Sequence, residues 1–168
     1  DCQTELSIFD HTRGRVWRYL NFFQHKAYIH SDIPRVMCGK CGSIKQIEVP
    51  WARPHSGFTI LFEAFIMELA AHMAVKPISK LVGEHGTRIW RIIHHYVDEA
   101  RAKEDFSYVE QIGIDETSSK RGHNYVSVFV DLERSKVLFA TEGKDAAAVK
   151  KFAKDLTKHG SNPDNIKE

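Results

Sequence analysis

The stretch QIGIDETSSKRGHNYVSVFVDL, residues 111–132, decides how the last third of the chain folds. It places Asp115 and Glu116 directly after an apolar run, and the chain then returns through a second apolar run. A third run, KVLFATEG at residues 136–143, follows after the short polar connection ERS. Apolar runs separated by tight polar connections predict a β-meander of three antiparallel strands.

The segment after these runs predicts a helix that packs on the sheet. DAAAVKKFAKDLTKHG, residues 145–160, has Asp145 near the N-cap, and Val149, Phe152 and Leu156 share its inner face. Three antiparallel strands followed by a helix are the opening order of an RNase H-like fold. In that fold a carboxylate on the first strand is one ligand of a metal pair that acts on a phosphodiester. Asp115 is therefore a candidate metal ligand, and the alternative is a strand-end acid that accepts backbone amides.

Three cysteines give the next signal. Cys38 and Cys41 lie in CGKCGS, where the C-x-x-C spacing followed by glycine points two thiolates at one tetrahedral centre. A redox C-x-x-C would open a helix, whereas the sequence after Cys41 alternates like a strand. We therefore predict a structural zinc knuckle, with Cys2 as a further Zn²⁺ ligand.

The fourth zinc ligand has two interpretations. The partner of Cys2 in a second C-x-x-C would precede the first residue, so we expect a knuckle that is truncated in this sequence. The alternative is a histidine ligand, and the candidates are His11, His25 and His30. Alternation at residues 15–38 predicts short antiparallel strands, which zinc could stabilise without any contact role.

The middle of the chain is predicted to be helical. FTILFEAFIMELAAHMA, residues 58–74, has one wide apolar face at i, i+3, i+4 and i+7 spacing. VKPISKLVGEHGTRIWRIIHHYVDEARA, residues 75–102, predicts a short helix over residues 77–82, a break at Gly83, a turn through Gly86 and a long helix from Thr87. A short helix, a glycine-containing turn and a second helix are typical of a helix-turn-helix.

The second of these helices has two different faces. The expected buried stripe is Ile89, Ile93, Tyr96, Val97 and Ala100. Four polar residues face elsewhere, near the end where a recognition helix contacts base edges and phosphates: Thr87, Arg88, Arg91 and His95. A helical hairpin with a polar outer face is the alternative.

Composition limits the class of protein. The chain has 168 residues, 42% of them hydrophobic and 27% charged, and no apolar run approaches the roughly 20 residues that span a bilayer. The net charge is only +2, but residues 1–57 contain eight Lys and Arg against five Asp and Glu. This excess is a weak indication of phosphate contact, and a solvated basic face is the better explanation of the charge alone.

Three segments together resemble a known family. CGKCGS, ISKLVGEHGTRIWRII and IGIDETSSKRGHNYVSVFVDLERSKVLFATEGKDAAAV are similar to the N-terminal part of an ISL3-family insertion-sequence transposase. The third segment is the most specific, because it matches the family's GIDE strand, its KGH turn and its Gly-basic-Asp entry to the helix. The turn here reads Lys120, Arg121, Gly122 and His123, a small departure.

The resemblance implies an α+β multidomain chain in three parts. These are a zinc-ribbon β unit at residues 1–53 with its first knuckle truncated, a helix-turn-helix DNA-binding domain at 54–105, and the first three strands and helix of an RNase H-like α/β domain at 106–168.

The resemblance also implies roles for single residues. Asp115 corresponds to the first acid of the DDE triad and would bind Mg²⁺ or Mn²⁺, while Glu116 would have a supporting role. Asp131 is expected to be a turn residue. Arg88, Arg91, Lys120 and Arg121 would neutralise DNA phosphates.

The implied function is DNA transposition. Double-stranded DNA, as terminal inverted repeats and as target, would be cut and joined by a homodimer or higher oligomer in the bacterial cytoplasm, at the nucleoid. The other two acids are expected after residue 168, since Asp164 and Glu168 are poor substitutes, so residues 1–168 alone should be inactive. The alternatives are a DNA-binding regulator with a non-catalytic RNase H-like domain, and a nuclease that cuts without joining.

Overall fold

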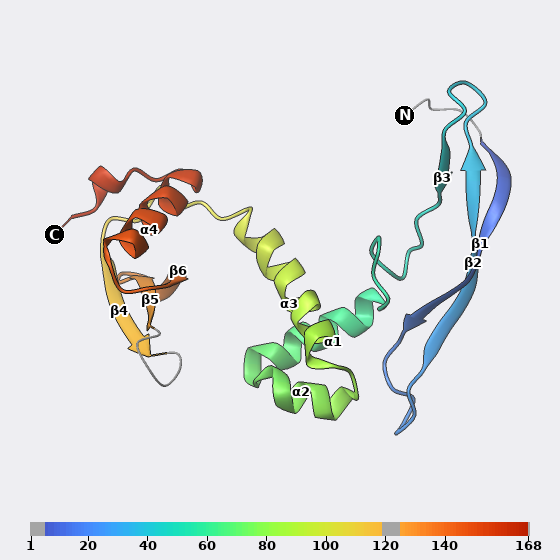
Figure 1. The fold of residues 1–168 in the computed structure, drawn as a ribbon, viewed down its shortest axis with the longest axis horizontal. Coiled ribbons are helices and arrows are strands. Elements are labelled where there is room, and N and C mark those ends of the chain that lie inside the picture. The colour runs from blue at the N-terminus through green and yellow to red at the C-terminus, as the bar shows by residue number, and fades with distance from the viewer. Residues whose placement is uncertain (1–5, 119–124, 168) are drawn as a thin grey trace. The chain divides into compact units, whose positions relative to one another are not determined.

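The computed structural model describes residues 6–118 and 125–167. These residues form a mixed α/β structure with two antiparallel three-stranded sheets and four α-helices (Figure 1). They divide into two compact units, Asp1–Val97 and Asp98–Glu168.

The sheet of the first unit has its strands in sequence order: β1 (Ser7–Arg18), β2 (Tyr28–Met37) and β3 (Ile44–Gln46). The register between β1 and β2 shifts twice, and Gly14 adopts the left-handed φ of 64° within the second shift. Trp17 and Ile33 are buried at the base of the sheet, where Trp17 meets Trp51 edge to face at 5.8 Å. The three candidate histidine ligands, His11, His25 and His30, are exposed.

The first unit also contains α1 (Ile60–His72), α2 (Val75–Val82) and most of α3 (Gly86–Arg101), whose residues from Asp98 on belong to the second unit. Thr59 caps α1 by accepting a hydrogen bond from the Phe62 amide. Gly83 ends α2 with a left-handed φ of 67°, a conformation that glycine adopts without steric cost. The predicted helix-turn-helix geometry is therefore present, with α2 starting two residues earlier than expected.

The core of these helices is one apolar cluster: Phe58, Phe62, Ile66, Ile78, Val82, Ile89 and Ile92. The predicted stripe on α3 was correct at Ile89, and Ile93 and Tyr96 pack against the cluster. It was wrong at Val97 and Ala100, which are exposed, and it omitted Ile92. The apolar cluster extends along α3 only as far as Tyr96. Residues after Tyr96 with the same helical spacing therefore have no cluster to pack against.

The second unit contains the predicted β-meander and helix: β4 (Ile112–Ser118), β5 (Tyr125–Asp131), β6 (Lys136–Glu142), α4 (Ala146–Lys158) and the 3₁₀ helix η1 (Pro163–Asn165). Asp145 is the N-cap of α4 and accepts hydrogen bonds from the amides of Ala147 and Ala148. Phe152 stacks on Phe129 of β5 at 4.2 Å between ring centroids. Helix α4 therefore packs on one face of the sheet.

The inner face of α4 differs from the prediction by one position. Phe152 and Leu156 are buried as expected, but the third buried residue is Ala148, while Val149 is 47% exposed. The small Ala148 lets the first turn of the helix approach the sheet, and Val149 lies at the border of the packed face.

Strand β4 forms one edge of its sheet, because the strand order among the described residues is β4-β5-β6. After α4 the chain returns toward this edge, and the amide of Lys167 donates to the Glu110 carbonyl at 2.8 Å, two residues before β4 begins. The end of the described chain therefore lies beside the start of β4.

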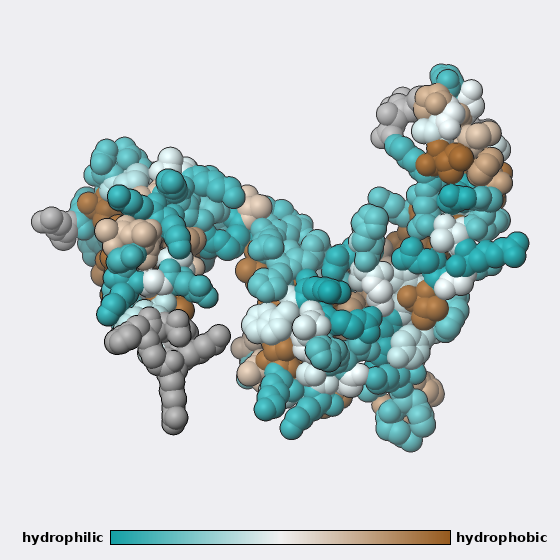
Figure 2. Space-filling model, in the orientation of Figure 1, coloured by the Kyte–Doolittle hydropathy of each residue, from teal (hydrophilic) through white to brown (hydrophobic). Residues whose placement is uncertain are grey.

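The face of the molecule drawn in Figure 2 is mostly hydrophilic, with hydrophobic residues in separate patches. Across residues 6–118 and 125–167, we find no helix with the length and apolar content that crossing a bilayer requires.

Candidate functional site

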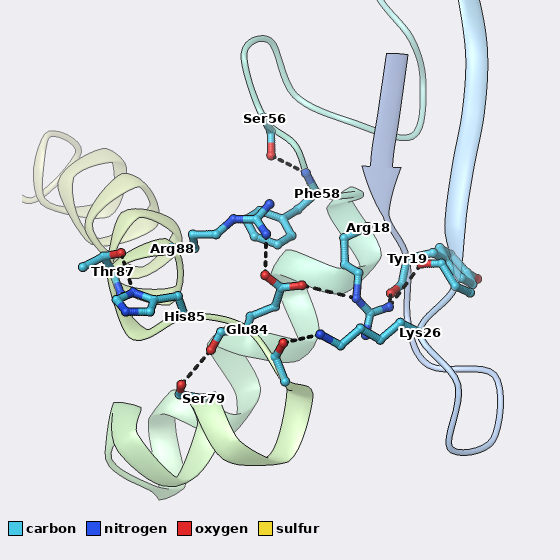
Figure 3. A network of polar contacts seen from close by, with 12 residues as sticks. Arg18, Tyr19, Lys26, Ser56, Phe58, Ser79, Glu84, His85, Thr87 and Arg88 are labelled. Carbon is cyan, nitrogen blue, oxygen red and sulfur yellow. Dashed lines mark hydrogen bonds and ion pairs between the residues drawn. The ribbon is translucent and has the colours of Figure 1, made fainter. Parts of the chain in front are cut away.

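The turn between α2 and α3 is fixed by a buried carboxylate. Glu84 is 7% exposed and lies between two guanidinium groups, Arg18 of β1 at 3.5 Å and Arg88 of α3 (Figure 3). Ser79 donates its hydroxyl to the Glu84 carbonyl at 2.6 Å, and Lys26 donates to the Gly83 carbonyl. Charge pairing from the β1–β2 hairpin therefore holds the turn that orients α3.

A second buried carboxylate fixes the loop before α1. Glu63 is fully buried and accepts hydrogen bonds from Arg53 Nε at 2.8 Å, Ser56 Oγ at 2.6 Å and the Tyr96 hydroxyl at 2.9 Å. The Ser56 hydroxyl also accepts from the Phe58 amide at 3.0 Å. These bonds connect the loop at residues 53–58 to α1 and α3.

The predicted DNA-contacting residues of α3 lie on or near one side of the helix. Thr87, Arg91 and His95 are exposed. The Thr87 hydroxyl lies 2.9 Å from His85 Nδ1. Arg88 is only partly exposed, because it pairs with Glu84 and lies over the Phe58 ring at 4.3 Å. Near the start of α3, Arg88 is therefore held by its contacts, whereas Arg91, about one helical turn later, is exposed.

The two buried acids, Glu63 and Glu84, and their partners were not predicted from the sequence. Glu63 lies within an otherwise apolar run, and this was the available signal, because a buried carboxylate requires donors. Arg18 and Arg53 have no comparable signal, since each meets its partner only in the folded chain. Lys120 and Arg121, also predicted to contact DNA, lie outside the described residues.

Asp115 occupies the middle of β4, with an exposed side chain. The β4–β5 register pairs Asp115 with Val128, and it pairs the preceding residue, Ile114, with Phe129 of the α4-packed core. Asp115 therefore lies on the sheet face opposite α4, and the next residue, Glu116, lies on the α4 face. One Asp115 oxygen accepts a hydrogen bond from the Glu116 amide at 2.9 Å.

Asp131, at the end of β5, has the surroundings of a turn residue. It is 2% exposed and accepts the amides of Glu133 and Arg134 at 3.0 and 3.2 Å in the β5–β6 connection. Asp164 lies in η1 and its amide donates to Asn162.

The two cysteines of the predicted knuckle lie at a turn closed by a backbone hydrogen bond. The Gly42 amide donates to the Cys38 carbonyl at 2.8 Å, and Gly42 has a left-handed φ of 67°. Cys38 is buried and Cys41 is exposed, and neither forms a disulfide. Binding of Zn²⁺ by these thiols therefore stays a prediction. Cys2 lies outside the described residues.

No complete metal site forms within the described part of the chain, where no three His, Cys, Asp or Glu side chains gather closely enough to hold an ion. Asp115 alone fits one position of a site for a hard cation, because Mg²⁺ and Mn²⁺ prefer carboxylate oxygen. Hydrogen bonds from Arg35 lower the pKa of Asp10, and the Ser107 amide lowers the pKa of Asp105.

Comparison with known families matches both units. Residues 47–97 match the family described as the helix-turn-helix domain of transposase family ISL3, and residues 112–168 match the DDE family of ISL3, described as transposase. No solved structure matches the chain.

Two curated relatives are similar along most of this chain. The transposase for insertion sequence element IS1557 of Mycobacterium tuberculosis is 31% identical over 159 residues, which cover 90% of this chain and 34% of the relative. The transposase for insertion sequence element IS1001 of Bordetella parapertussis is 23% identical over 162 residues, covering 92% of this chain and 38% of the relative. The chain thus spans about a third of the length of these relatives.

The two matched segments define the class of the chain: a helix-turn-helix domain and a DDE domain, both of transposase families. Within that class, the chain belongs to the ISL3 family. The expected resemblance is therefore confirmed.

Proposed function

We propose that the protein binds the terminal inverted repeats of its insertion sequence through the first unit, and that it cuts and joins DNA at a metal-dependent site that includes Asp115. The observation that supports catalysis best is the position of Asp115, an exposed carboxylate on the edge strand of a sheet matched to the DDE family. DNA binding follows from the helix-turn-helix domain, because such domains place the second helix, here α3, in the major groove.

The chain would have three parts: a zinc ribbon at residues 1–53, a helix-turn-helix domain at 54–105 and the start of an RNase H-like domain at 106–168. The order β4, β5, β6 and α4, and the return of the chain to the β4 edge, support the RNase H-like topology. Cys38 and Cys41 would hold Zn²⁺, and Cys2 would contribute a third thiolate.

At the catalytic site Asp115 would hold one position of a divalent cation, Mg²⁺ or Mn²⁺. When bound, the cations would activate the attacking oxygen and stabilise the leaving 3′ oxygen of the scissile phosphodiester. The remaining carboxylates would come from outside residues 1–168, so this segment alone would bind DNA without cutting it. A dimer or higher oligomer on nucleoid DNA would bring two element ends together.

Strand-transfer activity of the full-length transposase tests this function. The assay supplies Mg²⁺ and DNA that carries the element's ends, and it compares the wild type with Asp115→Asn. We expect cutting and joining by the wild type, none by the variant, and equal DNA binding by both. If both proteins bind DNA and neither cuts it, a regulator with a non-catalytic RNase H-like domain becomes the better interpretation.

A further inference from the structure

The first unit has a hollow beside α3, and part of its lining comes from residues outside the helix-turn-helix motif. It has a volume of about 170 Å³ and lies between α3 and the loop at residues 53–58. Four basic side chains line it: Arg53, His55, Arg88 and Arg91. A hollow of this kind admits a small anion and offers it several N–H donors.

The charges around the hollow do not cancel. Arg53 pairs with the buried Glu63, and Arg88 pairs with the buried Glu84, which Arg18 also contacts. Arg91 is exposed and adds a further positive charge. The two buried acids therefore do not neutralise all the basic groups, and the hollow keeps a net positive charge. Their ion pairs also fix the positions of Arg53 and Arg88 at its wall.

The guanidinium groups retain donors for a ligand. Arg53 donates to Glu63 through Nε, and Arg88 donates to Glu84 through Nη1. Among the described residues, the other two guanidinium nitrogens of Arg53 have no further hydrogen-bond partner. The Arg88 guanidinium lies over the Phe58 ring at 4.3 Å from its centroid (Figure 3), and a Cβ added to Gly57 would lie 3.5 Å from Arg88 Nη2. The missing side chain at Gly57 therefore leaves room beside Nη2 for an acceptor.

The loop that carries these groups is held in one conformation. The Glu63 contacts with Arg53 and Ser56 fix it at two points. Between them, His55 has a φ of 61°, a strained conformation for a residue with a side chain, and its side chain is exposed. Loop and helix groups thus face the same hollow without needing to reorganise for a ligand.

We propose that this hollow binds one phosphate of the DNA backbone, next to the place where α3 meets the bases. This inference rests on the proposed DNA-binding function and adds a contact from outside the two helices of the motif. Arg53, His55 and Arg91 would surround the phosphate, and Arg88 would complete the cradle from α3. A flanking phosphate contact sets the depth and register of the recognition helix and does not itself read the sequence.

A neighbouring hollow of about 260 Å³ shares Arg53 and His55 but is less suited to an anion. It contains the carboxylate of Glu48, and its additional cation, Arg15, lies over the Trp17 ring at 5.3 Å. The phosphate site is therefore the hollow beside α3.

The test is DNA binding by the 168-residue chain, measured by fluorescence anisotropy over a range of salt concentrations. The probes are a duplex with the element's terminal inverted repeat and a duplex of equal length and scrambled sequence. Two substitutions at position 55 suit its left-handed backbone, His55→Asp, which places a negative charge in the hollow, and the neutral His55→Asn. Arg91→Gln removes a cation from the hollow, and Lys150→Gln on α4 is the control for a charge lost elsewhere.

We expect His55→Asp to weaken binding to both duplexes at least tenfold at low salt, and His55→Asn to change it much less. Arg91→Gln should reduce the slope of log K against log salt by about 0.9, the value for one phosphate contact. Repeat probes that carry one neutral methylphosphonate at a time locate the contact. One position should weaken binding by the wild type and have no effect on His55→Asp.

Two results would overturn the inference. If His55→Asp and Arg91→Gln bind both duplexes as Lys150→Gln does, while Thr87→Ala loses preference for the repeat, α3 binds DNA and the hollow holds no phosphate. If the wild type binds neither duplex, the proposed DNA-binding function fails and the phosphate site fails with it. Tryptophan fluorescence of each variant checks that the first unit is folded.

Discussion

Replacing Glu63 with glutamine should destabilise the first unit substantially. Glu63 is fully buried and accepts hydrogen bonds from Arg53, Ser56 and Tyr96. A glutamine keeps one acceptor oxygen but loses the charge, and its amide N–H groups would face donors. Leaving one partner of a buried ion pair uncompensated costs about 3–5 kcal/mol, and the partly exposed Arg53 recovers some of this cost from water, so we expect a loss of about 2–4 kcal/mol.

Urea unfolding followed by tryptophan fluorescence measures this loss. The three tryptophans of the chain, Trp17, Trp51 and Trp90, all belong to the first unit, so the signal reports that unit alone. Glu68→Gln is the matched control, because Glu68 is on the same helix and is 76% exposed. The control should change the free energy of unfolding by less than about 0.5 kcal/mol.

A double-mutant cycle with Tyr96→Phe separates the network from simple burial. If the carboxylate organises the network, the loss caused by Tyr96→Phe, about 1 kcal/mol in the wild type, should shrink in the Glu63→Gln background. A Glu63→Gln protein as stable as the Glu68→Gln protein would refute the reasoning, since it would mean that the buried charge is not needed to hold the loop.

Three further predictions concern backbone, capping and pH. Gly83→Ala should cost about 1–2 kcal/mol in the same urea assay because of its left-handed φ, whereas Gly86→Ala, at an ordinary φ, should not; equal effects would contradict this explanation. Asp145→Ala should cost about 1 kcal/mol, seen as faster amide hydrogen exchange in α4, and unchanged exchange would exclude a capping role. Arg35 holds the pKa of Asp10 below its ordinary value, so this pair stabilises the fold above about pH 4 and its contribution is lost as the pH falls through the lowered pKa. The melting temperature of Asp10→Asn should therefore fall less on acidification than that of the wild type, and parallel curves would show that the pair contributes nothing.

The elements of this fold were predictable where local patterns and packing agree. Gly83 lies between two segments with helical apolar spacing. The helix boundary was predictable there because α2 ends in a left-handed conformation that favours glycine. The three strands after residue 111 follow from alternation and polar turns. The errors at Val97 and Val149 have a shared cause: both have helical spacing, but each lies beyond the partner surface that would bury it.

The candidate site was predictable only in part. Thr87, Arg91 and His95 could be selected because they share a helix, and helical geometry relates residues that are close in the sequence. The hollow beside α3 brings Arg53 and His55 to Arg91 across more than thirty residues, through contacts that exist only in the folded chain. The sequence gives one indication of this arrangement, which is the acid Glu63 in an apolar stretch of α1, because a buried Glu63 needs a partner such as Arg53.

The pairing of Arg18 with Glu84 bears on how this DNA-binding region could be transplanted. The family match at residues 47–97 includes all of α1 and α2 and most of α3, but it leaves out Arg18, which is 1% exposed and also lies over the Phe62 ring at 5.2 Å. A graft that begins at residue 47 would leave the buried Glu84 with one of its two cations and uncover part of Phe62. The smallest unit that could be transplanted to carry the proposed DNA binding therefore includes the end of the β1–β2 hairpin, and an exchange between relatives would have to include the hairpin and the helices together.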